Sequence, residues 1–384
     1  MDTQKTLKSV QNLLPSIRAR REEIEKARRM PNDLVEALRE TGVFAWSVPR
    51  AIGGAEASPL DLMQVTETVA SADGSAGWCA MIANGSNIGA GYMNEQGARE
   101  IFADPTRPTA GIAAPTGTAV RVDGGVKVNG RWAFASGITH CDWVWGGCVV
   151  MENGQPRMTS HGPEIIYVWL PVGEVKIHDT WHVSGLCGTG SNDFTATDVV
   201  VPENRIFSLL DPTGHRPEPL YQMPPLTLFV AQLVCVSLGI ARSALDELTE
   251  IAQTKVPSLY QTVLADRPVA QIELAQAEAA LGSARSFLFD TIEDMWQTVS
   301  AGRQPTSRQL AFGRIAAINA AETGATVTRT ANTLAGGSAI YTKSSLQRHA
   351  RDAEAVTHHF TVAPHTWEEA GRVLLGRNPN TPVF

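Results

Sequence analysis

Residues 351–364, which read RDAEAVTHHFTVAP, are the most informative stretch of the chain. Their alanine and glutamate content favours a helix, and we expect this helix to carry Arg351-Asp352 and to continue into His359. Adjacent histidines point apart on a helix, whereas a metal site needs ligands on one face. No metal is therefore expected at His358 and His359, and a single histidine here is more often a packing or capping residue. Only the wider pattern makes one of the two an acid–base candidate.

Length and charge bound the class of protein. At 384 residues the chain is too long for one simple core, and two or three lobes are expected. Its 43% hydrophobic and 18% charged residues are typical of a soluble globular protein. The formal net charge is 32 − 39 = −7, without a basic run. Duplex nucleic acid and anionic membranes are therefore not expected as partners.

Three features bear on the cellular compartment. The five cysteines are odd in number, scattered, and never form a CxxC pair, which favours buried thiols in a reducing compartment over disulfides or a zinc site. Residues 1–5 lack the apolar core of a signal peptide. Residues 226–241 are strongly apolar but too short to cross hydrocarbon comfortably, and we expect the start of a long buried helix. Together these features predict a cytoplasmic location.

The periodicity of the sequence changes twice along the chain. Residues 1–108 read as helices, with Ser58 as an N-cap before a proline. Residues 109–215 alternate as strands do, and the Asp-Gly-Gly run at 123–125 predicts a tight turn between two strands. Residues 216–384 return to helices rich in Ala, Glu, Leu and Gln. The predicted fold class is α+β, with an N-terminal helical domain, a central β-barrel-like domain and a C-terminal helical bundle.

Three segments have the composition of a cofactor-binding surface. Residues 132–137 (WAFASG) end a strand with small residues, which lets a flat ring approach the backbone, and Ser136 can hydrogen-bond a ring nitrogen. The glycine-dense loop at residues 185–192 (GLCGTGSN) can offer backbone N–H groups to a phosphate. Residues 114–119 (APTGTA) are similar in character. Each segment has a structural alternative, a strand edge or an ordinary β-turn, and spacing alone leaves both open.

Over nearly its full length the chain resembles the acyl-CoA dehydrogenase fold family. The shared marks are Val48-Pro49, Gly53-Gly54, Val201-Pro202, Gly336-Gly337 and Arg351-Asp352. One branch is more similar, the group D flavin-dependent monooxygenases, which are oxygenase components of two-component systems such as the seco-phenol and hydroxyphenylacetate hydroxylases. The branch marks are residues 123–125, Asn129-Gly130-x-Trp132, Ser136-Gly137-x-x-His140, residues 188–192 and residues 351–364.

The resemblance implies roles for single residues. Ser136 resembles the serine beside flavin N5, and His359 resembles the active-site histidine over the flavin, a proton donor or base. The adjacent His358 leaves the choice of histidine open. Where the dehydrogenases place a catalytic carboxylate, one residue later, this chain has Phe360. Further flavin-binding positions implied by the resemblance are Thr116, Gly117, Trp132, Phe134, Trp181, Thr189 and Ser191. Candidates for the substrate pocket are Trp78, Asn84, Asn87 and Met223.

Two departures from the family pattern bear on the cofactor. The dehydrogenases grip the FAD pyrophosphate with an Arg-x-Gln-Phe-Gly motif, whereas the corresponding residues 255–259 here read KVPSL. This favours the shorter FMN, taken up as FMNH2 and held by Lys255, with FAD as the alternative. The second departure is Cys187, which stands where the family has an arginine, so the phosphate or loop contact there is expected to differ.

By resemblance the protein is a flavin-dependent monooxygenase. A separate NAD(P)H:flavin reductase would supply the reduced flavin, O2 would give a C4a-hydroperoxide, and one oxygen would pass to a phenolic ring or a heteroatom of a small substrate. The fold implies a homotetramer in which Gly336-Gly337 reaches a neighbour's flavin. Two alternatives stay open. One is an acyl-CoA dehydrogenase whose base comes from another helix, with Glu273, Glu278 and Glu293 as candidates; the other is a non-catalytic scaffold of the same fold.

Overall fold

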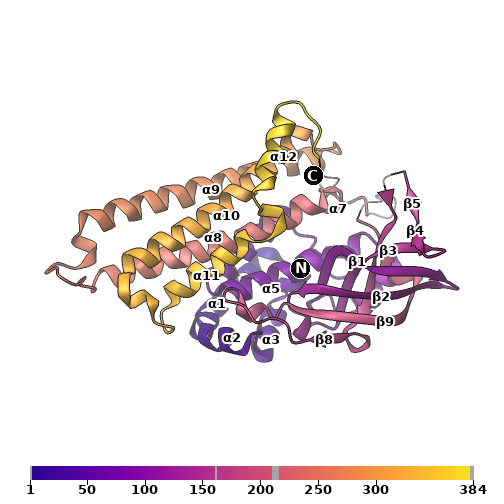
Figure 1. Ribbon diagram of the computed structural model, residues 1–384, viewed down its shortest axis with the longest axis horizontal. Helices are drawn as coiled ribbons and strands as arrows, with labels where there is room; N and C mark the ends of the chain where they lie inside the picture. The colour runs from indigo at the N-terminus through magenta and orange to yellow at the C-terminus, as the bar shows by residue number, and fades with distance from the viewer. Residues whose placement is uncertain (1, 161, 210–215, 381–384) are drawn as a thin grey trace.

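The computed structural model describes residues 2–160, 162–209 and 216–380, which form three regions in chain order (Figure 1). Local signals begin and end the N-terminal helices. Ser58 and Asp61 form a capping box at the start of one helix, and Gly42 ends another with φ 83°. The helices are α1 (Thr3–Ala19), α2 (Arg21–Ala27), α3 (Asn32–Thr41), α4 (Pro59–Ala70), α5 (Gly74–Asn87) and α6 (Glu95–Ile101).

One sheet dominates the middle region, in the strand order β10-β7-β3-β1-β2-β9-β8. The predicted turn at residues 123–125 is confirmed, because β1 and β2 form an antiparallel hairpin with Val122 opposite Gly125. β4 pairs with β3, and β5 pairs with β6 as a separate short ribbon. The strands are β1 (Ala110–Val122), β2 (Gly125–Ala135), β3 (Trp143–Glu152), β4 (Gln155–Pro156), β5 (Met158–Thr159), β6 (Gly162–Pro163), β7 (Ile165–Pro171), β8 (Lys176–His178), β9 (Asn192–Pro202) and β10 (Ile206–Phe207).

The sheet rolls around a core of its own. Trp132 on β2 is fully buried and stacks on Phe194 of β9, with 4.9 Å between the ring centroids. Its indole nitrogen donates to the carbonyl of Gly147 at 2.8 Å, so the buried N–H is satisfied. β7 and β9 are not neighbours in the strand order, yet their Cα atoms come within 8 Å of each other. The predicted barrel-like domain is confirmed as a sheet that partly closes on itself.

The C-terminal region is a bundle in which three long helices run side by side away from the sheet (Figure 1). The region contains α7 (Pro219–Gln222), α8 (Pro225–Ala252), α9 (Pro268–Ser300), α10 (Ser307–Ala335), α11 (Ser345–Thr357) and α12 (His365–Leu374). Within the described ranges α8 is the one helix that length and composition would allow to cross a membrane, and 89% of its most apolar window is buried inside the protein. The long buried helix predicted from residues 226–241 is therefore confirmed.

The three regions meet at α5. This helix packs against α4 and α8, and it contacts β1, α11 and the short 3-10 helix η6 (Cys187–Thr189). Its glycines, alanines and serines allow that close approach on nearly every side, and almost all of its residues are buried. The predicted order of helices, strands and helices is confirmed. The predicted boundary at residue 108 falls between α6 and β1, whereas residue 215, at the second boundary, lies outside the described residues.

Candidate active site

Four side chains from two regions form one hydrogen-bonded series, the hydroxyl chain, which consists of Trp78, Ser136, Ser191 and Thr189. The indole nitrogen of Trp78 donates to Ser136 Oγ at 3.0 Å, and Ser136 Oγ lies 2.6 Å from Ser191 Oγ. Ser191 Oγ lies 2.7 Å from Thr189 Oγ1, which donates to the carbonyl of Leu186 at 2.8 Å. The structure thus brings three predicted site residues together with a tryptophan of α5.

Strand register positions the hydroxyl chain. Ser136 follows Ala135, the last residue of β2, which pairs with Asn192, the first residue of β9. Thr189 ends η6, and that turn begins after Leu186, whose φ is 52°. A leucine with positive φ is uncommon and persists only where the surrounding structure holds it. The surrounding structure therefore holds the loop before β9 in a backbone conformation that is unfavourable for the isolated segment.

The Arg351-Asp352 pair holds this loop from α11. Asp352 Oδ1 accepts the N–H of Leu186 at 2.6 Å, and the Arg351 guanidinium donates to the carbonyl of Ser184. Gly185 lets the loop approach this closely, because a Cβ there would lie 2.2 Å from the Arg351 carbonyl oxygen. Burial raises the pKa of Asp352 to about 7. The pair is thus the physical link between α11 and η6.

His359 lies beside the hydroxyl chain but not on a helix. α11 ends at Thr357, and His359 has φ −69° and ψ 133°, so the predicted continuation of the helix into His359 is wrong. The imidazole Nδ1 lies 2.7 Å from Thr361 Oγ1 and caps the short 3-10 helix η11 (Phe360–Val362). A side chain that caps the following turn competes with continuation of the preceding helix.

Aromatic rings surround His359. Its ring centroid lies 6.1 Å from that of Trp78, 5.7 Å from that of Phe229 on α8 and 4.9 Å from that of Phe360. Burial lowers the pKa of His359 to about 4, so the imidazole is neutral at neutral pH. His358 is exposed. The geometry therefore brings His359, and not His358, to the hydroxyl chain.

A second aromatic pair lies on the sheet side of the loop. Phe134 is 68% exposed with φ 67°, and its ring meets that of Trp181 edge-on at 6.1 Å. The backbone N–H of Trp181 donates to Asn192 Oδ1, and its indole nitrogen donates to the carbonyl of Leu186, both at 3.1 Å. An exposed aromatic side chain on a strained backbone suggests a binding role. These rings and the nearby hydroxyls suit a flat heteroaromatic ligand.

Three of the residues predicted to bind the cofactor lie in the sheet and have no hydrogen bond to the hydroxyl chain. The Trp132 ring lies in the core of the sheet. Gly117 is buried against that ring, since a Cβ there would lie 2.2 Å from it. Thr116 is exposed, and its hydroxyl donates to the carbonyl of Arg131 at 2.9 Å. Of the three, only Thr116 presents its side chain at the surface.

Lys255 lies at the opposite end of the bundle from His359. It follows α8, and its ammonium donates to Ser338 Oγ. Phe229, which contacts His359, stands near the start of α8. At a rise of about 1.5 Å per residue, Ala252 at the end of the helix lies about 35 Å from Phe229. Within one chain the structure does not bring Lys255 to the hydroxyl chain.

Two residues of the site carry no signal in the sequence. Arg28 donates to the carbonyl of Trp181 at 3.0 Å and pairs with Asp179 at 2.8 Å, so it places a cation beside the loop that contains Cys187. Phe229 lies in an apolar run where nothing distinguishes it from its buried neighbours. Arg28 could have been suspected only from its position just after a helix, and Phe229 not at all.

The other substrate-pocket candidates serve the core. The amides of Asn84 and Asn87 donate to the backbone carbonyls of Val43 and Phe44 at 3.0 and 2.7 Å, which ties α5 to the preceding chain. Met223 is buried in the main hydrophobic cluster. Of the four candidates, Trp78 is the one that joins the hydroxyl chain.

Two of the carboxylates considered as an alternative base have partners on the bundle surface. Glu278 receives both guanidinium N–H groups of Arg242 at 2.7 Å, and Glu293 accepts from Gln297 at 2.9 Å. Both side chains are engaged on α9, a helix that points away from the sheet (Figure 1).

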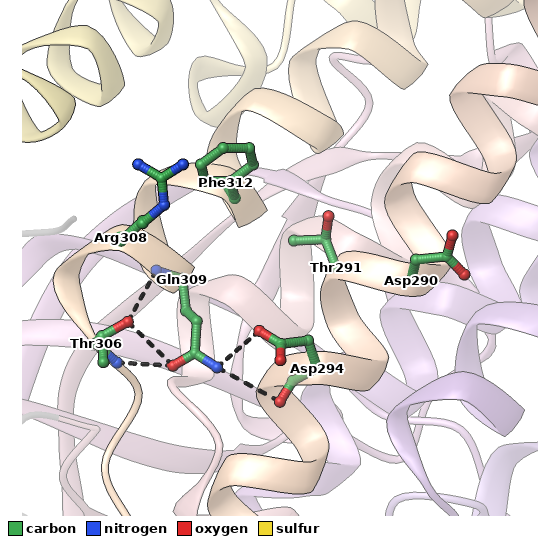
Figure 2. A pocket seen from close by; sticks show the side chains of 7 residues that line it. All are labelled: Asp290, Thr291, Asp294, Thr306, Arg308, Gln309 and Phe312. Carbon is green, nitrogen blue, oxygen red and sulfur yellow. Dashed lines mark hydrogen bonds between the residues drawn. The ribbon is translucent and has the colours of Figure 1, made fainter.

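A separate hollow of about 350 Å³ lies between α9 and α10 (Figure 2). Its polar groups satisfy one another: the Gln309 side chain accepts from the Thr306 backbone N–H at 2.9 Å and donates to Asp294 at 2.8 Å. This arrangement is the capping box of α10. The hollow contains no predicted site residue. Its lining is Asp290, Thr291, Asp294, Thr306, Arg308, Gln309 and Phe312.

A partly closed sheet between two helical regions, with Trp78 between His359 and the hydroxyls, is the layout expected of the acyl-CoA dehydrogenase fold. Residues 3–102 match the family described as "Acyl-CoA dehydrogenase, N-terminal domain", and residues 231–364 match "Acyl-CoA dehydrogenase, C-terminal domain". The chain belongs to this family and, within it, to the flavin-dependent monooxygenases that act as oxygenase subunits.

Individual relatives agree with that placement. The chain is 36% identical to an indole-3-acetate monooxygenase of Pseudomonas putida, over 94% of this chain and 91% of the relative. It is 30% identical to the oxygenase subunit HsaA, a flavin-dependent monooxygenase of Mycobacterium tuberculosis, over 98% and 95%. The crystal structure of the HsaA monooxygenase superposes with a TM-score of 0.92 at 28% identity and covers 100% of both chains. The dehydrogenase and scaffold alternatives are accordingly set aside.

Proposed function

We propose that the protein takes up reduced FMN from a separate NAD(P)H:flavin reductase and uses it to hydroxylate a small aromatic substrate. The observation that carries this proposal is the position of His359, a neutral imidazole whose ring lies near those of Trp78, Phe229 and Phe360. Trp78 in turn donates to Ser136. Reduced flavin, when bound, supplies the electrons that activate O2. The chain would supply aromatic surroundings and a base.

The role of His359 follows from its protonation state. An aromatic hydroxyl or ring N–H becomes a better nucleophile when a base takes up its proton. Burial lowers the pKa of His359 to about 4, so the imidazole stays neutral across the neutral range. In the tautomer whose Nδ1–H donates to Thr361 Oγ1 at 2.7 Å, Nε2 keeps a lone pair that can accept a substrate proton. A flavin and a substrate bound over these rings would exclude water, which would strengthen the remaining hydrogen bonds. A carboxylate at position 360 would be an anionic base, but this chain has a phenylalanine there.

The position of Lys255 fits a role in FMN binding only within an assembly of chains. Lys255 and Ser338 form one polar point at the far end of the bundle, and this point lies too far from Ser136 to serve the same chain's flavin. We propose that the protein is a cytoplasmic homotetramer. In such a tetramer Lys255 would instead contact the phosphate of the FMN bound to a neighbouring subunit. Arg28 beside Trp181 would face the same cofactor from its own chain.

The substrate class rests on the aromatic surroundings of His359 and on the named activities of the relatives. A planar substrate can pack against Trp78 and Phe229 by offset or edge contacts. An indole carrying a short acid side chain is the first candidate, because the relative at 36% identity is an indole-3-acetate monooxygenase. A simple phenol is the second.

Turnover under labelled oxygen tests the proposal. The protein is mixed with FMN, NADH and a flavin reductase under 18O2, and indole-3-acetate or a phenol is added. The expected product carries one 18O atom per molecule and appears only when the protein is present. Reductase and FMN without the protein form the control. Complete conversion of the reduced flavin to hydrogen peroxide with every aromatic tested, with no labelled product, would overturn the assignment.

A further inference from the structure

We infer that Gly85 on α5 sets the upper size limit of the aromatic substrate, because it is the point where this helix leaves room beside Phe229. The inference rests on the proposed function, since it assumes that a planar substrate packs against Trp78 and Phe229. It concerns which aromatic compounds the site accepts, a choice that this chain makes and the flavin does not.

Gly85 is the exception in the burial of α5. Every other residue of the helix is buried, whereas Gly85 is partly exposed. It follows Trp78 by seven residues, and positions seven apart fall on the same face of a helix. The exposed position therefore lies on the Trp78 side of α5, and the Trp78 ring is the one that meets His359.

Close packing explains a second glycine of the same helix but not Gly85. Glycine is less favourable than alanine in a helix interior, so its presence there calls for a physical reason. A Cβ at Gly77 would lie 2.4 Å from Ala70, so Gly77 lets α4 approach. A Cβ at Gly85 would have only two atoms of the described residues within 4 Å, apart from its own helical turn, and both belong to the Phe229 ring. The space beside Gly85 is therefore bounded by one movable side chain.

Phe229 connects Gly85 to the proposed base. Its ring atoms lie 3.2 and 3.5 Å from the position of a Cβ on Gly85, and its centroid lies 5.7 Å from that of His359. Phe229 and His359 are both partly exposed, so neither side chain is sealed in the core. Carbon atoms pack best at about 3.5–4.0 Å, so a methyl group at position 85 would displace the Phe229 ring. The room for a substrate between Phe229 and His359 would then change.

These surroundings suit a planar apolar molecule of bicyclic size. The rings of Trp78 and Phe229 favour offset or edge contacts with a further ring. Seven residues of helix separate Trp78 from Gly85 by about 10 Å along the axis, which is long enough for an indole with a short side chain to lie along α5. A monocyclic phenol occupies only part of that length. A side chain added at position 85 should therefore penalise the bicyclic substrate and spare the monocyclic one.

A methyl group at position 85 tests the size limit. In Gly85→Ala, kcat/KM for indole-3-acetate should fall about tenfold or more relative to kcat/KM for phenol, since one methylene in an apolar site changes discrimination about tenfold to 200-fold. The assay contains FMN, NADH and a flavin reductase. Calorimetric dissociation constants, measured with FMN present, give the same comparison for a compound that binds without turning over.

The matched control is Gly282→Ala on α9. It makes the same helix substitution at a site where a Cβ would meet nothing within 4 Å, so the ratio of the two substrates should stay at the wild-type value. The double variant Gly85→Ala/Phe229→Leu should recover most of the lost ratio, because the smaller side chain returns the room that the methyl group takes. A loss that is equal for both substrates and is not rescued would show that Gly85 is only structural.

Failure of this inference differs from failure of the proposed function. If the wild type gives no labelled product with any aromatic compound, the proposed function fails. If the wild type gives product, while Gly85→Ala and Phe229→Leu both keep the wild-type ratio, Gly85 does not set the size limit and the proposed function stands. A wild type that hydroxylates phenol and no bicyclic compound would also overturn the inference alone. Thermal melting establishes that each variant is folded, and Phe229→Leu, which should shift the ratio toward the bicyclic substrate, decides the matter should Gly85→Ala not fold.

Discussion

The indole nitrogen of Trp78 donates to Ser136 Oγ at 3.0 Å, while the same ring lies 6.1 Å from the His359 imidazole. One tryptophan of α5 therefore contacts both the hydroxyl series after β2 and His359, the proposed base, after α11. Ser136 and His359 are both far from Trp78 in the sequence. Helix α5 therefore connects two segments that only the fold brings together.

Replacement of Trp78 by phenylalanine should uncouple oxygen use from product formation. The variant loses the donor to Ser136 and part of the apolar wall beside His359, so water gains access. We expect at least a severalfold rise in hydrogen peroxide per reduced flavin consumed. Trp169→Phe is the control, because that ring is fully buried among Phe102, Trp145 and Phe207. Equal peroxide yields from the two variants would contradict the special position of Trp78.

Replacement of His359 by alanine should reduce hydroxylation far more than reduced-flavin affinity. A positioned general base typically contributes about a hundredfold or more, and His359 is the neutral imidazole next to the Trp78 ring. His358→Ala is the matched control, because that side chain is exposed. Single-turnover product formation and anaerobic flavin titration separate the two effects. A loss of similar size in both variants would argue against His359 as the base.

The pH dependence of hydroxylation should be shallow across the neutral range. Burial lowers the pKa of His359 to about 4, below its ordinary value of 6.5. The neutral form is thus present above about pH 5, and the rate should fall only as the pH drops through the folded pKa. Because of the same shift, the folded state binds fewer protons than the unfolded state between these two pKa values. The stability that His359 contributes in its neutral form is therefore lost as the pH falls from about 6.5 to 4. A rate profile with a midpoint near pH 6.5 that disappears in His359→Ala would contradict the burial argument.

Asp352 should make stability change with pH in the opposite direction to His359. Burial raises its pKa from 3.8 to about 7, so the folded state retains a proton that the unfolded state releases. Stability should therefore decline as pH rises from about 4 to 7 and level off above that, by roughly a few kcal/mol at most, since one pKa unit is about 1.4 kcal/mol. Asp352→Asn keeps an acceptor for the Leu186 N–H and removes the titration. Thermal melts of the two proteins should lie close together at acidic pH, where Asp352 is protonated, and the wild type should lose stability relative to Asp352→Asn as the pH rises to about 7; parallel curves would refute it.

Trp132 should matter for stability and not for flavin binding. Its ring is fully buried against Phe194, and its nitrogen bonds the Gly147 carbonyl. Trp132→Phe removes that bond and leaves space in the sheet core, at a cost of about 1–3 kcal/mol in unfolding free energy. Phe134→Ala, which alters the exposed ring beside Trp181, should instead weaken flavin binding with little loss of stability. Chemical denaturation and flavin titration of the pair distinguish the two positions.

Local signals in the sequence were enough for the order of elements. The alternating pattern around residues 123–125 and the Ser58 cap describe contacts between near neighbours, and both are confirmed. The end of α11 was not predictable from helix propensity, because the imidazole of His359 caps the following turn.

The site depends on contacts that span long stretches of sequence. Asp352 and Leu186 are 166 residues apart, and Phe229 approaches His359 from another region altogether. The resemblance brought Ser136, Thr189, Ser191 and His359 to attention, but only the folded chain shows that three of them share their protons in series. Trp132, placed by the same resemblance at the cofactor, turned out to have its ring in the core of the sheet.

The separation of about 35 Å along α8 between Phe229 and Ala252 has a consequence for how cofactor affinity scales with protein concentration. In the proposed homotetramer, a contact of Lys255 with a flavin held at Ser136 would come from another polypeptide. Dilution past the point where subunits dissociate would then weaken cofactor retention by mass action alone, and added cofactor would in turn favour reassociation of the subunits.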